Sequence, residues 1–167
     1  MSAKKNTIEG RLELTPAVEE GPYYTPGSPE RKTIAEKGTP GTKLVVEGRV
    51  LDSNGRPIPH AWVDFWHADG HGRYDNEGYN LRGHQYTDKD GRYHLETVRP
   101  LEYLFRAAHI HTKVRAKENS PVLTIQLFFP GEKKNTTDPI FEKLTVMDVK
   151  DTPDGQKATF DFVVEIE

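Results

Sequence analysis

Residues 106–114 read RAAHIHTKV and show the alternation of side chains that is typical of a β-strand. Successive side chains of a strand point to opposite faces, so His109 and His111 share one face, while Ile110, Thr112 and Val114 share the other. Neutral imidazole is a common ligand of zinc, copper, iron and nickel, so the pair can supply half of a four-ligand metal site. The motif is short, and the alternative is a pair of solvated histidines on the outer face of a sheet.

The composition of the chain excludes several classes of site and partner. The 167 residues include 26 acidic and 23 basic residues, with a net charge of −3. This length fits one domain with one core, and the balanced charge gives no reason to expect nucleic acid or an anionic membrane as a partner. Cysteine is absent, which excludes thiolate metal sites and cysteine nucleophiles and leaves any metal to His, Tyr, Asp or Glu. No apolar run resembles a secretory signal or a membrane span, so we expect a cytoplasmic protein.

The first 42 residues are rich in proline and glycine, which disfavour both a long helix and a central strand. We therefore predict an extended, irregular arm over residues 1–42. It contains two adjacent aromatic residues, Tyr23 and Tyr24, whose rings must pack on the domain, reach a site or contact a neighbouring subunit.

Residues 43–167 contain short strand patterns separated by turn signals such as Asn54-Gly55 and residues 87–91, TDKDG. The predicted strands cover residues 43–51, 61–67, 92–98, 108–114, 122–129 and 158–166. Short strands at this spacing predict an all-β fold, a β-sandwich of mostly antiparallel strands. The only predicted helical turn covers residues 138–143, where Asp138 can act as N-cap and Pro139 can occupy the first helical position.

Further metal ligands must come from irregular segments next to strand ends. Tyr74 follows the glycines after the predicted strand 61–67, and Tyr103 lies six positions before His109. The pattern alone does not select these two among the seven tyrosines, since most tyrosines bury the ring and hydrogen-bond the hydroxyl.

Three other polar residues are weaker candidates. His67 and His71 lie close to Tyr74, but the surrounding glycines do not fix a common orientation, and we expect both to be solvated. Arg82, followed by a glycine, is expected to fix a loop rather than to touch a substrate.

Several segments resemble, in order, the intradiol ring-cleavage dioxygenases, the family that includes protocatechuate 3,4-dioxygenase and catechol 1,2-dioxygenase. These segments are VVEGRV, WHADGHGRYDN, TDKDGRY, RPLEY, RAAHIH and LTIQLFFPGE. The resemblance runs from about Glu20 to Glu132, and EGPYYTPGSP in the arm resembles the family's segment before the core. It is specific because several motifs occur in the right order.

The resemblance implies a mononuclear non-haem site that holds a single Fe(III) ion per chain. Tyr74 and Tyr103 match the family's two tyrosine ligands, and His109 and His111 match its HxH pair. The implied substrates are a catechol and O2, and the implied product is a cis,cis-muconate-type dicarboxylate. No flavin, haem or nicotinamide is needed.

The resemblance also implies roles around the bound ring. Arg106 and Gln126 match polar residues beside the substrate, and Tyr103 matches the ligand that substrate displaces. Two phenolates and one hydroxide cancel the charge of Fe(III), so a catechol dianion preserves neutrality if it replaces the hydroxide and one tyrosinate. The displaced group can then accept the substrate's proton, and Arg106 can stabilise developing negative charge. We place Tyr23 at the pocket mouth.

The connection between Tyr103 and Arg106 departs from the family, because only Leu104 and Phe105 separate them where the family has a longer loop. We therefore expect a more open pocket and modest discrimination among substituted catechols.

Two other classes of protein compete with this interpretation. A non-catalytic β-sandwich module of the carboxypeptidase-regulatory or adhesin type would also resemble VVEGRV, GRPIPHAWV and TDKDGRY. A zinc hydrolase is disfavoured, since two phenolates suit a trivalent ion better than catalytic zinc. Assembly as a homo-oligomer stays open.

Overall fold

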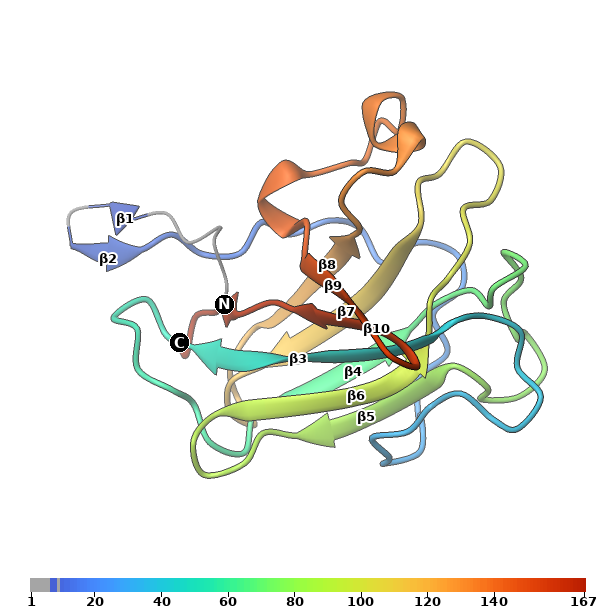
Figure 1. Cartoon of the computed structure of the whole chain (residues 1–167). Helices are drawn as coiled ribbons and strands as arrows, with labels where there is room; N and C mark the ends of the chain where they lie inside the picture. Colours follow the sequence, from blue (N-terminus) through green and yellow to red (C-terminus); the bar gives the residue numbers. More distant parts are fainter. Residues whose placement is uncertain (1–6, 9) are drawn as a thin grey trace.

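The computed structural model describes residues 7–8 and 10–167, which are built almost entirely of strands and loops (Figure 1). Residues 1–6 and 9 of the predicted arm lie outside the described residues. The strands are β1 (Thr7–Ile8), β2 (Arg11–Leu12), β3 (Lys43–Leu51), β4 (Trp62–Trp66), β5 (Arg82–Tyr86), β6 (Arg92–Val98), β7 (His109–Arg115), β8 (Val122–Phe128), β9 (Asp148–Thr152), β10 (Gly155–Thr159) and β11 (Phe162–Val163). Two short 3-10 helices are η1 (Lys133–Thr136) and η2 (Lys143–Thr145). Within the described part of the chain, no helix is long and apolar enough to cross a membrane.

The strands form two main sheets, as the predicted β-sandwich requires. One sheet has the order β5-β4-β7-β8. In the other, β3 pairs with β6, β10 and β11, and β9 pairs with β10. Most neighbouring strands are antiparallel, whereas β10 and β11 run parallel to β3. The predicted fold class is confirmed.

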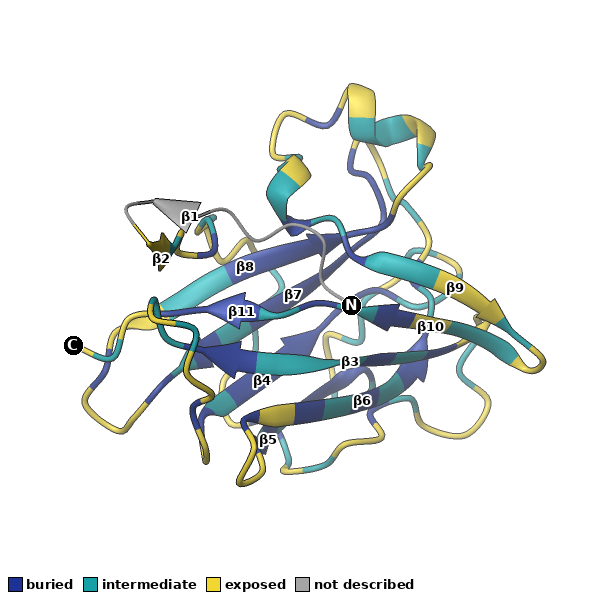
Figure 2. Ribbon diagram, turned by 60° about the vertical axis from the view of Figure 1, so that its left-hand side comes forward, coloured by how far each residue is buried: buried dark blue, intermediate teal, exposed yellow. Residues whose placement is uncertain are grey.

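The hydrophobic core contains residues of both sheets, and Figure 2 shows the buried positions along their strands. Val63 and Phe65 on β4 belong to it, as do Ile110 and Val114 on β7. These are the apolar positions that the alternating pattern predicts to share a face. The residues that alternate with these core positions along β4 and β7 therefore point to the outer face of the four-stranded sheet.

The N-terminal arm crosses this outer face and covers it. The backbone N–H of Val18 donates to Thr124 on β8, and that of Arg31 donates to His84 on β5, each at 2.9 Å. Between these points the ring of Tyr24 packs on Trp66 of β4, with ring centroids 4.7 Å apart. Polar side chains on this face are consequently shielded from water. Burial makes an unpaired polar group costly in free energy and strengthens the hydrogen bonds and charge interactions that are formed there.

The predicted strand 158–166 is wrong in its extent, since β10 ends at Thr159 and β11 has two residues. Both strands pair with β3. Between them the carboxylate of Asp161 accepts a hydrogen bond from Arg49 N at 2.9 Å. At this point the backbone N–H of Arg49 bonds a side-chain oxygen instead of a backbone carbonyl, so the hydrogen-bond ladder between β3 and the chain from β10 to β11 is interrupted.

The predicted helical turn at residues 138–143 is also wrong, because η1 ends at Thr136 and η2 begins at Lys143. Asp138 Oδ1 does accept a hydrogen bond from Ile140 N, at 2.8 Å. Its Oδ2 accepts instead from Arg106 Nε and Ala107 N, both at 2.9 Å. These long-range bonds hold the segment as a turn against the start of β7.

Candidate metal centre

Four aromatic side chains bring their donor atoms together on the outer face of the four-stranded sheet. His109 and His111 project from β7, Tyr74 from the β4–β5 connection and Tyr103 from the β6–β7 connection. Tyr74 Oη lies 2.8 Å from His111 Nε2 and 3.0 Å from Tyr103 Oη. Tyr103 Oη lies 3.4 Å from His109 Nε2, and the two Nε2 atoms are 3.1 Å apart. The four residues predicted as ligands thus form one cluster.

The register of the sheet determines which residues neighbour the histidines. His111 lies opposite Trp66 on β4 and opposite Gln126 on β8. Directly opposed residues of neighbouring strands point to the same face, so an indole, an imidazole and an amide form a row beside the cluster. Both histidines are buried, with 2% of His109 and 1% of His111 exposed, and the alternative of solvated histidines is therefore wrong.

The two imidazole rings are held in different ways. His109 Nδ1 donates to the carbonyl of Ala107 at 2.7 Å, which leaves a lone pair on Nε2. The ring of His111 is stacked on Trp66, with centroids 4.7 Å apart and an interplanar angle of 6°. Its Nδ1 is buried and has no hydrogen-bond partner among the described residues.

One glycine lets the two tyrosine-bearing loops meet. Gly72 has a φ of +79°, and a Cβ there would lie 2.9 Å from the carbonyl oxygen of Glu102 and 3.3 Å from the Cβ of Tyr103. The backbone N–H of Leu101 also donates to Asp69 O at 3.0 Å. Glycine is therefore required by both the backbone conformation and the close approach of the loops.

Burial sets the protonation of the cluster. It lowers the pKa of His109 to about 4 and the pKa of His111 well below its ordinary value, so both imidazoles are neutral at pH 7. Burial also raises the pKa of Tyr74 and the pKa of Tyr103 above the usual value, so both phenols keep their protons unless a cation is close.

This donor set fits a hard, highly charged metal ion. Metal–nitrogen and metal–oxygen bonds of about 2.0–2.1 Å separate neighbouring ligand atoms by about 2.8–3.4 Å, and neighbouring donor atoms of the cluster lie 2.8–3.4 Å apart. A group of three or more His, Cys, Asp or Glu residues placed to hold a metal does not occur among residues 7–8 and 10–167. The two phenols are therefore essential members of the candidate centre.

Arg106 lies beside the cluster and is fixed by a residue that the sequence did not reveal. Its Nη2 donates to Gln126 Oε1, and its Nε donates to the buried carboxylate of Asp138 at 2.9 Å. Arg106 and Gln126 are thus neighbours. Asp138 carried only a helix-capping signal in the sequence, and no local pattern relates it to an arginine 32 residues away.

The ring of the arm residue Tyr23 lies against the two tyrosines of the cluster. Its ring stacks on Tyr74 with centroids 4.3 Å apart and meets Tyr103 edge-on at 6.3 Å. Arg82 Nη1 donates to Tyr23 O at 2.6 Å, and its Nε donates to Asp75 O at 3.1 Å. Arg82 therefore ties the arm to the loop that carries Tyr74, which agrees with its expected loop-fixing role.

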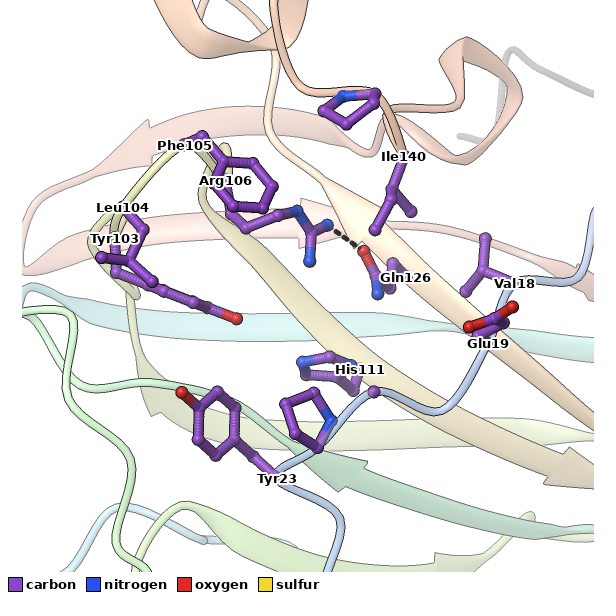
Figure 3. A pocket seen from close by; sticks show the side chains of 13 residues that line it. Val18, Glu19, Tyr23, Tyr103, Leu104, Phe105, Arg106, His111, Gln126 and Ile140 are labelled. Carbon is purple, nitrogen blue, oxygen red and sulfur yellow. Dashed lines mark hydrogen bonds between the residues drawn. The ribbon is translucent and has the colours of Figure 1, made fainter.

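A cavity of about 630 Å³ opens beside the cluster and is lined by two of its residues, Tyr103 and His111 (Figure 3). Figure 3 shows Tyr103, Arg106, Gln126 and His111 around one space, with Tyr23 on the opposite side. The remaining lining residues come from the arm, from the turn after Tyr103 and from the segment after Asp138; they are Val18, Glu19, Gly21, Pro22, Leu104, Phe105, Pro139 and Ile140.

The short connection after Tyr103 is a tight turn. Arg106 N donates to Tyr103 O at 2.9 Å, and Leu104 at the tip has a φ of +52°, a backbone conformation that is strained for leucine. The turn is stabilised by Lys134, whose Nζ donates to Leu104 O and lies 2.9 Å from the carboxylate of Glu102.

The two other histidines near Tyr74, His67 and His71, differ in burial. His71 is exposed, as expected. His67 is buried, so the expectation that it is solvated is wrong. Its Nδ1 hydrogen-bonds Ala68 O at 2.6 Å and its Nε2 hydrogen-bonds Thr97 Oγ1 at 2.7 Å, which makes it a link between the two sheets.

Comparison with known proteins agrees with this architecture. A family model described as "Dioxygenase" matches residues 19–165. The protocatechuate 3,4-dioxygenase beta chain of Burkholderia cepacia is 32% identical over 129 residues, which cover 66% of this chain and 55% of the relative. The 6-chlorohydroxyquinol 1,2-dioxygenase of Cupriavidus pinatubonensis is 30% identical over 172 residues, covering 86% of this chain and 62% of the relative. This chain therefore spans only part of the length of these relatives.

Solved structures resemble the whole fold. The dioxygenase domain of a dioxygenase carbohydrate-binding protein fusion from a Streptomyces species superposes with a TM-score of 0.89 at 43% identity, covering 93% of this chain and all of that domain. The 3-chlorocatechol 1,2-dioxygenase of Rhodococcus opacus gives a TM-score of 0.82 at 26% identity, covering 90% of this chain and 71% of that chain. The family model and the similar structures place the chain among proteins described as dioxygenases. More particularly, the chain belongs to the intradiol ring-cleavage dioxygenase family.

Proposed function

We propose that this protein is a Fe(III)-dependent intradiol dioxygenase, which uses O2 to cleave a catechol between its two hydroxyl-bearing carbons and gives a cis,cis-muconate-type dicarboxylate. The observation that carries the proposal is the ring of four contacts, each of 2.8–3.4 Å, that joins the donor atoms of Tyr74, Tyr103, His109 and His111 beside a cavity that Tyr103 and His111 line. A structural β-sandwich module has no need of such a cluster.

In this proposal the four residues hold a single Fe(III) ion per chain. When bound, Fe(III) supplies the positive charge that ionises the two phenols and activates the catechol toward O2. The two tyrosines then differ in role. Tyr103 lines the cavity, so its Oη would be the ligand that faces the substrate and would accept a proton from a substrate hydroxyl. Tyr74 is covered by the stacked ring of Tyr23 and stays in place.

Arg106 and Gln126 act on the ring of the substrate. Within the described part of the chain, Arg106 Nη1 has no hydrogen-bond partner, whereas Nε and Nη2 are held by Asp138 and Gln126. A guanidinium fixed on two of its nitrogens can direct the third at a substrate without further loss of side-chain freedom. We assign Arg106 the stabilisation of negative charge that develops on the ring.

The test is to load the protein with Fe(III), add catechol under 18O2 and identify the product by mass spectrometry. The proposal predicts a dicarboxylate that carries both oxygen atoms from one O2 molecule. His71→Ala, which changes an exposed histidine of the neighbouring loop, is the matched control and should give the same product. Failure to cleave the ring in an iron-loaded protein, or cleavage outside the two hydroxyl-bearing carbons, would contradict the proposal.

A further inference from the structure

The cavity is much larger than an unsubstituted catechol. Its volume of about 630 Å³ lies within the range of about 300–1,000 Å³ that holds drug-sized ligands. Catechol has only eight non-hydrogen atoms. If the two catechol hydroxyls lie at the metal centre, the far side of the ring faces the mouth, and most of the cavity is left for a substituent.

Apolar side chains gather at this mouth. Leu104 is 76% exposed, Phe105 is 61% exposed and Ile140 is 40% exposed, and all three line the cavity. Single exposed apolar residues are ordinary, but several at the rim of one cavity mark a binding surface. Leu104 and Phe105 stand between two residues of the site, Tyr103 and Arg106, so the apolar surface is continuous with the place where the ring binds.

The charges around the cavity are unfavourable for an anionic substituent. Arg106 is the only cation of the lining, and its charge is met by the carboxylate of Asp138 at 2.9 Å. The other charged lining residue is Glu19, which is exposed and has no ion-pair partner among the described residues.

Two lysines on neighbouring segments are already paired. Lys113 Nζ lies 2.8 Å from Glu20 Oε1, and Lys134 Nζ lies 2.9 Å from Glu102 Oε2. Neither is therefore available to neutralise a carboxylate that the ring would carry to the mouth.

We propose that the preferred substrate is a neutral catechol with an apolar substituent, which packs against Leu104, Phe105 and Ile140, and that Glu19 disfavours ring carboxylates. This inference rests on the proposed function and deepens it. The expected gain in affinity per methylene can be calculated, because fully burying a methylene contributes about 0.8 kcal/mol, or about fourfold in the binding constant. At an open rim that covers about half of each methylene, we expect about twofold per methylene.

The first experiment compares 4-methyl-, 4-ethyl-, 4-propyl- and 4-butylcatechol, whose rings are electronically alike. Their affinities are measured without O2 from the visible spectrum of the iron-loaded protein, and kcat/KM is measured with O2. From methyl to butyl we expect about an eightfold increase in affinity. The double variant Leu104→Asn, Phe105→Ser should abolish the increase; asparagine is chosen because it tolerates the positive φ at position 104. Leu101→Ser is the matched control, since Leu101 is exposed but does not line the cavity.

The second experiment compares 3,4-dihydroxybenzoate with its neutral amide, which has nearly the same shape. We expect the amide to bind about tenfold more tightly than the acid at pH 7, and Glu19→Gln to narrow that ratio of affinities. Glu13→Gln, which removes an exposed carboxylate outside the lining, should leave the ratio as it is.

The outcomes separate this inference from the proposed function. If 4-methylcatechol is bound and cleaved but the alkyl series is flat, or if the double variant keeps the wild-type increase, the inference is wrong and the proposed function stands. The inference is also overturned if the double variant changes the oligomeric state by size-exclusion chromatography and leaves the substrate ranking intact, because the apolar rim would then be a contact between subunits. If no catechol perturbs the spectrum, the proposed function itself fails.

Discussion

The two faces of β7 show two ways in which a sequence encodes structure. On the inner face, Ile110 and Val114 pack into a core that is built from both sheets. On the outer face, His109 and His111 are equally buried, yet their neighbours include loops and an arm that are distant in sequence. The inner face depends on apolar size and shape, whereas the outer face depends on particular atoms at particular distances. Changes on the inner face should therefore affect stability, and changes on the outer face should affect metal binding and chemistry.

The largest expected effect lies on the outer face. His109→Ala or His111→Ala removes a donor nitrogen that no neighbouring described residue can replace, so we expect loss of iron and of nearly all activity. Iron content after Fe(III) loading, measured by metal analysis, checks this prediction. His71→Ala is the control and should keep its iron. If His71→Ala lost iron while His109→Ala kept it, the assignment of the ligands would be wrong.

The inner face gives the complementary result. Ile110→Ala leaves a cavity in the core and should lower the free energy of unfolding by about 2–5 kcal/mol. Denaturant unfolding of the metal-free protein measures this loss. The same variant should still bind Fe(III), because its neighbours His109 and His111 point away from the core. Loss of iron by a folded Ile110→Ala protein would break the distinction between the two faces.

A smaller effect is expected at Asp138, which hydrogen-bonds none of the four proposed metal ligands. Asp138→Asn weakens the fixation of Arg106, and removal of such supporting residues typically costs about 10–100-fold. We expect that loss in kcat/KM with unchanged iron content. Asp88→Asn is the control, because Asp88 likewise accepts backbone N–H bonds, from Asp90 and Arg92, but in a turn at the surface. Equal losses in the two variants would contradict a positioning role for Asp138.

The smallest expected effect is far from the site, on β6. Partial burial lowers the pKa of His94, but hydrogen bonds to Glu96 and Glu47 outweigh it, so the pKa is raised overall. A raised pKa in the folded state adds stability that is fully present below the unfolded pKa of about 6.5 and is lost as the pH rises through the folded pKa. Because the group is partly exposed, the contribution is at most about 1 kcal/mol. Unfolding of wild type and His94→Gln at pH 5.5 and pH 8.5 should show a difference only at the lower pH.

Regular alternation let the sequence predict most of the sandwich, but it failed where strands lack an apolar pattern. β5 reads RGHQY, and its glycine is packed so closely that a Cβ would lie 2.6 Å from Ile34 Cγ2. β9 reads DVKDT and is a partly exposed edge strand. Both are strands because their neighbours supply hydrogen bonds and packing, and these tertiary effects leave no local signal.

In the candidate site too, some residues could be predicted from local sequence patterns and others depend on tertiary contacts. Strand periodicity alone put His109 and His111 on one face, whereas Tyr74 and Tyr103 could be selected only by resemblance to a family. Asp138 was missed, because its bond to Arg106 depends on how two loops fold against each other. His67 was misjudged for a similar reason, since its partner Thr97 lies on the other sheet.

The measurement that tests the central claim most directly is the iron content and the visible spectrum of the protein loaded with Fe(III). Two phenolates bound to Fe(III) should give a red-brown colour from tyrosinate-to-metal charge transfer, with about one iron per chain. Tyr74→Phe should weaken that band. A colourless protein that takes up no Fe(III) would contradict the account, because the four converging donor atoms would then serve structure alone.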